Sequence, residues 1–137
     1  MDKSPHYARE LVLKALYAYE QGEKKADDVF REIFRNEKLS VKNKVFAKTL
    51  FQLVISNLDW TDRQITLLAI NWDLNRIGAL DRNILRMTLI ELENIPETPF
   101  RVVLNEAIEL AKRFSTVESS KFVNGILDNF VKKKKLI

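Results

Sequence analysis

"KFVNGILDNF", residues 121–130, is the stretch that decides the fold class of this chain. Its Asn124-Gly125 pair, set between apolar residues, is a strong signal for a two-residue β-hairpin. A hairpin also needs flanking strands in which apolar and polar residues alternate, and neither flank alternates. Apolar residues recur instead at helical spacing: Phe122, Val123, Ile126, Leu127, Phe130 and Val131. The spacing predicts a helix over residues 117–133 with Gly125 in its interior.

A glycine inside a helix costs about 1 kcal/mol relative to alanine. We therefore expect an offsetting contact at Gly125, namely a second helix backbone packed too closely to admit a Cβ atom. The alternative is that the glycine is merely tolerated. Close packing predicts that Gly125→Leu destabilises the fold by about 1–3 kcal/mol through overpacking. At Asn124 we expect a buried side-chain hydrogen bond.

Helical periodicity also dominates the rest of the 137 residues, and three glycines and three prolines are too few for the turns of an all-β chain. Ser4 and Pro5 suit the N-cap and first position of a helix that ends near Gly22. Two capping boxes are predicted, Thr61–Gln64 after a break near 59–61, and Ser115–Glu118. Five further helices are predicted over about 26–36, 40–58, 61–72, 81–94 and 99–114. The sequence therefore predicts an all-α fold of about seven helices in a single domain, 1–137.

Composition excludes several classes of chemistry. The chain has no cysteine, so disulfides, zinc–thiolate sites and cysteine nucleophiles are absent. His6 is the only histidine, and no phosphate-binding glycine loop or serine–histidine arrangement can be assembled. No apolar run is long enough to cross a membrane, and we expect a cytoplasmic protein. These features predict a binding protein without catalytic residues.

Charge permits nucleic-acid binding without requiring it. The formal net charge is +4 and the isoelectric point is near 9.3. Part of this charge lies in the tail 132–137, which contains four consecutive lysines. In the first helix, a 3-4-4 spacing places four residues on one face: His6, Arg9, Leu13 and Tyr17. That face is either a second buried contact of the fold or a partner surface whose basic end attracts phosphate.

Two long stretches resemble the signature blocks of the NusB family of bacterial transcription antitermination factors. They are "NWDLNRIGALDRNILRMTLIEL", residues 71–92, and "PFRVVLNEAIELAKRFSTVESSKFVNGILDNF", residues 99–130. The opening "ARELVLKALYAYE", residues 8–20, fits as well. Together the blocks cover about half of the chain.

The resemblance implies an all-helical fold of two packed three-helix bundles, no enzymatic activity and no cofactor. It implies binding of boxA RNA together with NusE, a small-subunit ribosomal protein. The pair would join an antitermination complex on RNA polymerase, notably during ribosomal RNA transcription. Oligomeric state, including a homodimer, is left open.

The resemblance also implies site residues. Family members contact RNA through an arginine-rich stretch before the first helix, and this chain has no arginine run there. Only Lys3, His6 and Arg9 correspond to it. A second RNA-facing edge corresponds to Glu118, Lys121 and Phe122, and the positions that match the NusE contact are Tyr17, Asp81 and Arg82. Asp81 and Arg82 have structural alternatives, since Asp81 can cap a helix and Arg82, like Arg86, can pair internally with a residue such as Glu106.

Two other functions remain open. A NusB-like domain forms the N-terminal part of some ribosomal RNA methyltransferases, although 137 residues leave no room for the methyltransferase domain or its cysteines. The chain could also be a dimerising helical scaffold without RNA binding, because its N-terminal arginine content is low. Binding of boxA RNA with and without NusE distinguishes the scaffold from the antitermination factor.

Overall fold

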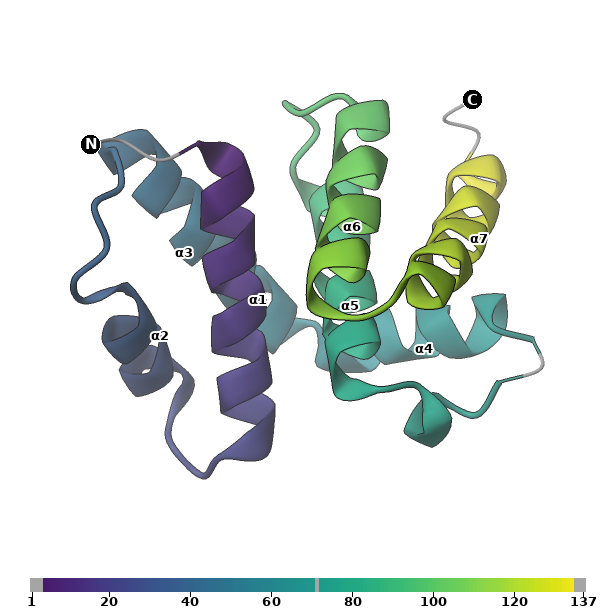
Figure 1. Cartoon of the computed structure of the whole chain (residues 1–137), viewed down its shortest axis with the longest axis horizontal. Coiled ribbons are helices and arrows are strands. Elements are labelled where there is room, and N and C mark those ends of the chain that lie inside the picture. Colours follow the sequence, from purple (N-terminus) through teal and green to yellow (C-terminus); the bar gives the residue numbers. More distant parts are fainter. Residues whose placement is uncertain (1–3, 71, 135–137) are drawn as a thin grey trace. The chain divides into compact units, whose positions relative to one another are not determined.

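The computed structural model describes residues 4–70 and 72–134, and all regular secondary structure in these residues is helical (Figure 1). The helices are α1 (Pro5–Gln21), α2 (Ala26–Phe34), α3 (Val41–Ser56), α4 (Leu58–Leu68), the 3-10 turn η1 (Leu74–Arg76), α5 (Ala79–Asn94), α6 (Phe100–Phe114) and α7 (Val117–Lys133). The all-α class and the seven helices are confirmed for this part of the chain. None of the described helices is long and apolar enough to cross a membrane. The chain divides into two compact units, residues 1–56 and 57–137.

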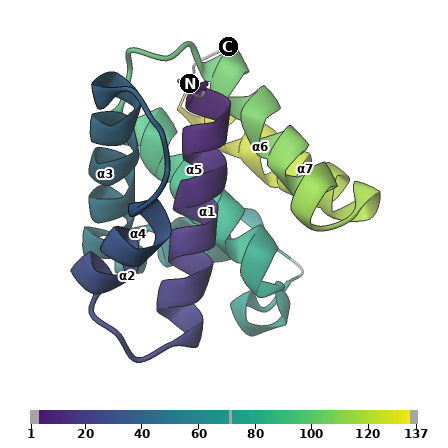
Figure 2. The ribbon, with the colours of Figure 1, turned by 60° about the vertical axis from the view of Figure 1, so that its left-hand side comes forward.

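Unit 1 (residues 1–56) is a three-helix bundle in which α1 packs against both α2 and α3 (Figures 1 and 2). Ser4 caps α1 as predicted, and its side chain accepts a hydrogen bond from the backbone N–H of Tyr7. Ser40 does the same for α3 through the N–H of Asn43. The Tyr7 hydroxyl donates to Glu37, which raises the pKa of Tyr7 and ties the loop before α3 to α1.

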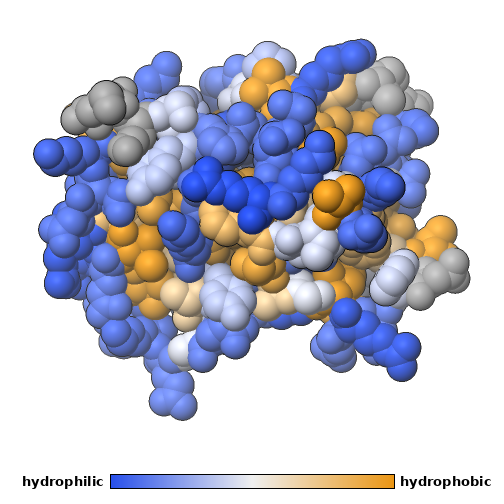
Figure 3. Space-filling view, viewed as in Figure 1, coloured by the Kyte–Doolittle hydropathy of each residue, from blue (hydrophilic) through white to orange (hydrophobic). Residues whose placement is uncertain are grey.

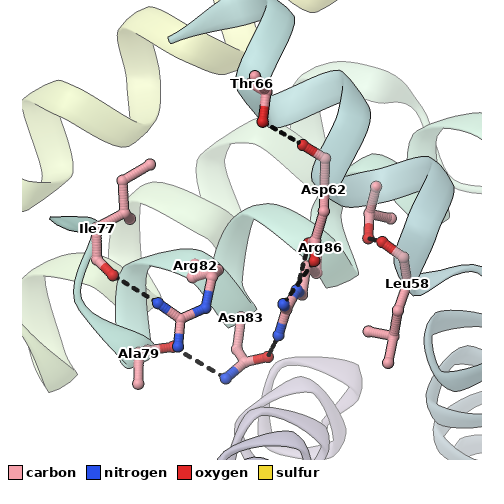
Figure 4. A network of polar contacts seen from close by, with 9 residues as sticks. Leu58, Asp62, Thr66, Ile77, Ala79, Arg82, Asn83 and Arg86 are labelled. Carbon is pink, nitrogen blue, oxygen red and sulfur yellow. Dashed lines mark hydrogen bonds and ion pairs between the residues drawn. The ribbon is translucent and has the colours of Figure 1, made fainter. Parts of the chain in front are cut away.

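Unit 2 (residues 57–137) has α5 at its centre. The stretch from Asn83 to Glu91 is buried at every position, because α4, α6 and α7 all pack against α5. Helices α5, α6 and α7 form the second predicted bundle, and α4 lies on α5 and α7. Arg86 donates from Nε to Asp62 Oδ1 at 2.7 Å and from Nη2 to Oδ2 at 2.9 Å, so this pair fastens α4 to α5 (Figure 4).

Several helix boundaries differ from the prediction, and those around α4 and α7 have a clear local cause. The break after α3 falls at Asn57 and not at 59–61, so Thr61 lies inside α4, where its hydroxyl donates to the carbonyl of Leu58. Helix α4 then ends at Leu68, short of the predicted residue 72. The N-cap of α7 is Thr116, which accepts from the N–H of Ser119, so Glu118 is one position too early to close the predicted capping box.

The helix over residues 117–133 is confirmed, but both expectations for its centre are wrong. Gly125 is exposed, and a Cβ atom added there would meet no atom within 4 Å. Asn124 is exposed as well. Gly125 lies on the side of α7 opposite to the buried Val123 and Leu127, so no close helix packing occurs there and overpacking by Gly125→Leu is no longer expected.

We expect Gly125→Ala to stabilise the protein by about 1 kcal/mol, because alanine restricts the unfolded chain and has room in the folded one. For a chain of this size the melting temperature should rise by about 4 °C in a thermal unfolding experiment. Val123→Ala, on the buried side of the same helix, is the matched control and should lower it. A decrease with Gly125→Ala would restore the close-packing interpretation.

Candidate nucleic-acid interface

An exposed aromatic pair in unit 2 marks the candidate site. Trp72 lies in the loop after α4, where 55% of its surface is exposed, and Phe122 projects from α7. Their ring centroids are 5.2 Å apart and the rings meet at 61°, so the edge of one ring faces the other. Large aromatic side chains are usually removed from water, and such exposure is typical of binding surfaces.

Local sequence explains why Trp72 is held outside the core. Asp73 accepts a hydrogen bond from the backbone N–H of Asn75 and thereby starts η1 directly after Trp72. Ile77, at the end of this turn, is buried and anchors the loop to unit 2. Arg82 donates to the carbonyl of Ile77 at 2.6 Å (Figure 4). The segment that follows the exposed tryptophan is therefore fixed to unit 2.

A cleft of about 350 Å³ opens on one side of the aromatic pair. Its lining combines the pair with one cation, two carboxylates and small groups: Trp72, Arg76, Ile77, Gly78, Asp81, Glu118, Ser119 and Phe122. Asp81 lies in the first turn of α5, where its charge is favoured by the helix dipole. Its Oδ1 atom is buried and has no hydrogen-bond partner among the described residues. A buried acceptor of this kind suits a ligand that brings an N–H donor.

A second, shallower hollow of about 370 Å³ lies on the other side of the pair. Trp72 and Phe122 line both hollows, and the second also contains Lys121, Gly125 and the exposed Ile70. Lys121 and Arg76 are both exposed and flank the aromatic rings from the two sides. Aromatic faces for stacking, with cations at their edges, are the combination that binds single-stranded nucleic acid.

The predicted RNA-binding residues divide between these hollows and other places. Glu118, Lys121 and Phe122 all lie in the described hollows of unit 2, together with Asp81. Lys3 lies outside the described residues. The RNA contacts of these side chains remain predictions.

The two predicted contacts in α1 are engaged within the protein. The Nε2 atom of His6 is 3.2 Å from Glu10, whose side chain is 2% exposed. The Arg9 guanidinium lies over the ring of Phe46, 5.0 Å from its centroid, and Arg9 is only 4% exposed. Leu13 is also buried. The middle of the face formed by His6, Arg9, Leu13 and Tyr17 is therefore a buried contact, and the partner-surface alternative fails there because those side chains are not accessible.

The predicted partner residues are placed differently from one another. Tyr17 is 42% exposed and is accessible to a partner. Asp81 does not cap α5, because the N-cap is Gly78. The Oδ1 atom of Asp81 has no hydrogen-bond partner among the described residues, so a contact of Asp81 with a protein partner remains a prediction. Arg82 is half-buried and hydrogen-bonded to the carbonyl of Ile77. The internal pair expected for Arg86 is present, with Asp62 as the acid.

Sequence reasoning missed Trp72 and Arg76. Trp72 was assigned to the apolar face of a helix, whereas it follows the end of α4. A signal was available, because "NWDLN", residues 71–75, concentrates asparagine and aspartate, which favour turns over helix interiors.

Comparison with known proteins identifies the family. The model of the NusB family matches residues 6–132. The transcription antitermination protein NusB of Chloroherpeton thalassium is 43% identical over 130 residues, which are 92% of this chain and 62% of that protein. The corresponding protein of Nitratiruptor sp. is 38% identical over 130 residues, covering 95% of this chain and 93% of that protein. These names denote a transcription factor and no reaction, in agreement with the predicted absence of enzymatic activity.

Solved structures agree in fold. NusB of T. maritima superimposes with a TM-score of 0.89 at 36% identity, covering 96% of this chain and 93% of that one. The NusB chain in a crystal structure of the antitermination factors NusB and NusE in complex with double-stranded RNA has the same fold, with a TM-score of 0.85 at 24% identity. It covers 93% of this chain and 96% of that one. By family match, sequence identity and fold, this chain belongs to the NusB family.

Proposed function

We propose that this protein is a transcription antitermination factor that binds boxA RNA together with NusE, in support of ribosomal RNA transcription. The observation that carries the proposal is the exposed Trp72–Phe122 pair between two hollows, with Arg76 and Lys121 at its edges. The names of the relatives support the antitermination role. A protein of this fold has been crystallised with NusE and double-stranded RNA, which supports the choice of partners.

RNA would be held by stacking, charge and hydrogen bonds. Unpaired bases stack on the rings of Trp72 and Phe122, while Arg76 and Lys121 neutralise neighbouring phosphates. The carboxylates of Asp81 and Glu118 repel phosphate, so their role is to accept hydrogen bonds from the amino groups of bases. No bond is made or broken, and the protein acts by presenting a rigid surface to RNA and to a protein partner on RNA polymerase.

NusE would contact the exposed Tyr17 and the half-buried Asp81, with Arg82 holding the loop after η1 in place. Asp81 serves both roles in this scheme, because it lies in the same cleft as Glu118 and Phe122. A partner near this cleft would enlarge the RNA surface. The small number of accessible cations around the aromatic pair makes such help necessary, since phosphate contacts supply much of the affinity for RNA.

We expect weak boxA binding by the protein alone, tighter binding with NusE, and a shallow dependence on salt. Each phosphate contact with a single strand contributes about −0.7 to the slope of log affinity against log salt concentration. Two or three contacts give a slope of about −1.5 to −2 for the protein alone. Fluorescence anisotropy with a labelled RNA limited to boxA, in a potassium chloride series with and without NusE, measures both quantities.

A scrambled RNA of equal length is the control for sequence preference. If NusE leaves the affinity for boxA RNA unchanged, the proposal that NusE enlarges the RNA surface is wrong. A slope several-fold steeper would show that a larger basic surface dominates. Within the lysine tail, Lys132 already pairs with Asp128 at 2.8 Å and Lys134 with Glu93 at 2.9 Å.

A further inference from the structure

A groove between α2 and α3 in unit 1 is basic on both walls. It has a volume of about 310 Å³ and is lined by Asp27, Phe30, Arg31, Phe34, Arg35, Lys44, Lys48, Phe51 and Gln52. Arg31 and Arg35 lie one helical turn apart on the α2 side, and Lys44 and Lys48 lie one turn apart on α3. Hydrophilic side chains cover the left-hand edge of Figure 3, where Figure 1 shows α2.

Positive charge is concentrated in this part of the chain. Residues 24–48 include eight lysines and arginines and four aspartates and glutamates, a net charge of +4 that equals the net charge of the whole chain. The surface around Trp72 does not concentrate charge in this way, since Arg76 shares its cleft with the carboxylates of Asp81 and Glu118, and Lys121 is the one cation among the described residues that line the second hollow. A strong anion-binding surface is therefore expected in unit 1.

Most of the nearby carboxylates already have partners. Asp28 accepts from Arg31 at 3.0 Å, Glu32 accepts from Lys24 at 2.7 Å, and Glu37 accepts from the Tyr7 hydroxyl. Among the described residues, three cations of the groove have no ion pair: Arg35, Lys44 and Lys48. All three are exposed, and Asp27 is the one carboxylate that lines the groove with them.

Aromatic rings lie between the two rows of cations. Phe30 is half-buried and stacks on Phe34 with centroids 4.0 Å apart and planes at 16°. Phe51 supports Phe30 from α3 at a centroid distance of 5.4 Å. Phe34 and Phe51 are buried, so the accessible ring of Phe30 rests on a fixed base. Cations along both walls can follow a phosphate backbone, and a supported ring can stack a base.

We propose that this groove is a second binding site for single-stranded RNA, which contacts the sugar–phosphate backbone without reading sequence. Carboxylates of an acidic peptide could also pair with the cations, but the supported ring of Phe30 favours a ligand that stacks. The choice of RNA over DNA rests on the proposed function, whereas the phosphate chemistry rests on the groove alone. The Arg35 guanidinium can hold a phosphate through two hydrogen bonds, and the lysines act as point charges.

The test uses Lys44→Gln/Lys48→Gln, which removes two cations from the groove. The matched control is Lys38→Gln/Lys42→Gln, which removes the same charge from exposed positions that do not line it. Binding of labelled oligouridine to the full chain is measured by fluorescence anisotropy across a salt series. Loss of two phosphate contacts should make the slope about 1.4 shallower and weaken binding about 25-fold at 0.1 M salt.

Three outcomes would overturn the proposal. The first is that Lys44→Gln/Lys48→Gln binds oligouridine as tightly as the control variant Lys38→Gln/Lys42→Gln does. The second is that the groove variant loses affinity for an oligoglutamate peptide but not for oligouridine. The third is a preference for oligothymidine DNA over oligouridine. Binding of boxA RNA with NusE is measured in parallel on Trp72→Ala. If Lys44→Gln/Lys48→Gln binds oligouridine normally while Trp72→Ala weakens boxA binding, only the groove proposal is wrong. If the groove variant loses oligouridine affinity while Trp72→Ala binds boxA RNA normally, only the proposed boxA surface is wrong.

Discussion

Trp72→Ala is expected to weaken binding of boxA RNA by the complex with NusE about 5- to 150-fold. Stacking of one base on an aromatic side chain contributes about 1–3 kcal/mol, and Trp72 is the more exposed ring of the pair. The substitution also removes one wall of both hollows. Titration of labelled RNA followed by anisotropy gives the affinity, and the melting temperature should change little because the side chain is largely outside the core.

Trp72→Phe is the matched variant, since it retains a ring for stacking and should recover most of the affinity. Trp60→Phe controls for the loss of a tryptophan elsewhere in unit 2, where Trp60 packs edge-on against Phe130 at 6.3 Å. If Trp72→Ala binds boxA RNA as tightly as the unchanged protein does, the aromatic pair is not part of the RNA surface.

Arg86→Met is expected to lower the free energy of unfolding by about 3 kcal/mol. Removing one partner of a buried ion pair costs about 3–5 kcal/mol, because the other charge remains without compensation. The lower end applies here, since the Arg86 side chain is 10% exposed but that of Asp62 is 27% exposed. The side-chain Oδ1 of Asn83 also loses a hydrogen bond, which Arg86 Nη1 donates at 3.1 Å (Figure 4). Urea denaturation measures the change.

Lys24→Met is the control for an exposed ion pair. Lys24 and Glu32 are 60% and 50% exposed, and such a pair contributes about 0–1 kcal/mol. The double variant Asp62→Leu/Arg86→Met should recover much of the lost stability, because an apolar pair needs no compensation. Equal effects of Arg86→Met and Lys24→Met would show that the Arg86–Asp62 pair does not fasten α4 to α5.

Much of the fold follows from periodicity because buried faces repeat with the helical turn. The stretch from Val117 to Lys133 was predicted with its observed bounds, since six apolar residues mark one continuous face. Caps at Ser4 and Ser40 were also predictable, because a side-chain oxygen before an apolar pattern satisfies backbone N–H groups. Where several candidate caps follow one another, as at Ser115 and Thr116, the pattern alone does not select the one used.

The environment of single residues was harder to predict. The sequence assigns Gly125 to a helix correctly, but the predicted close contact with a second helix is absent. Gly125 lies off the apolar face of α7, which already indicated that it is exposed. Trp72 has the hydrophobicity of a core residue, and only the turn that Asp73 starts holds it outside. Arg9 carries a charge, yet its position in α1 buries it over Phe46. Of these three cases, only that of Arg9 depends on a contact between segments distant in sequence.

The most direct test of the proposed RNA surface uses the two tryptophans of the chain as reporters. In a ¹⁵N-labelled sample the two indole N–H signals are assigned with the Trp60→Phe variant, and boxA RNA is titrated into the complex with NusE. We predict a large shift for Trp72 and for the backbone amides of Lys121 and Phe122, with little change at Trp60. Shifts confined to other residues, with Trp72 and Phe122 unaffected at saturating RNA, would contradict the assignment of this surface to boxA RNA.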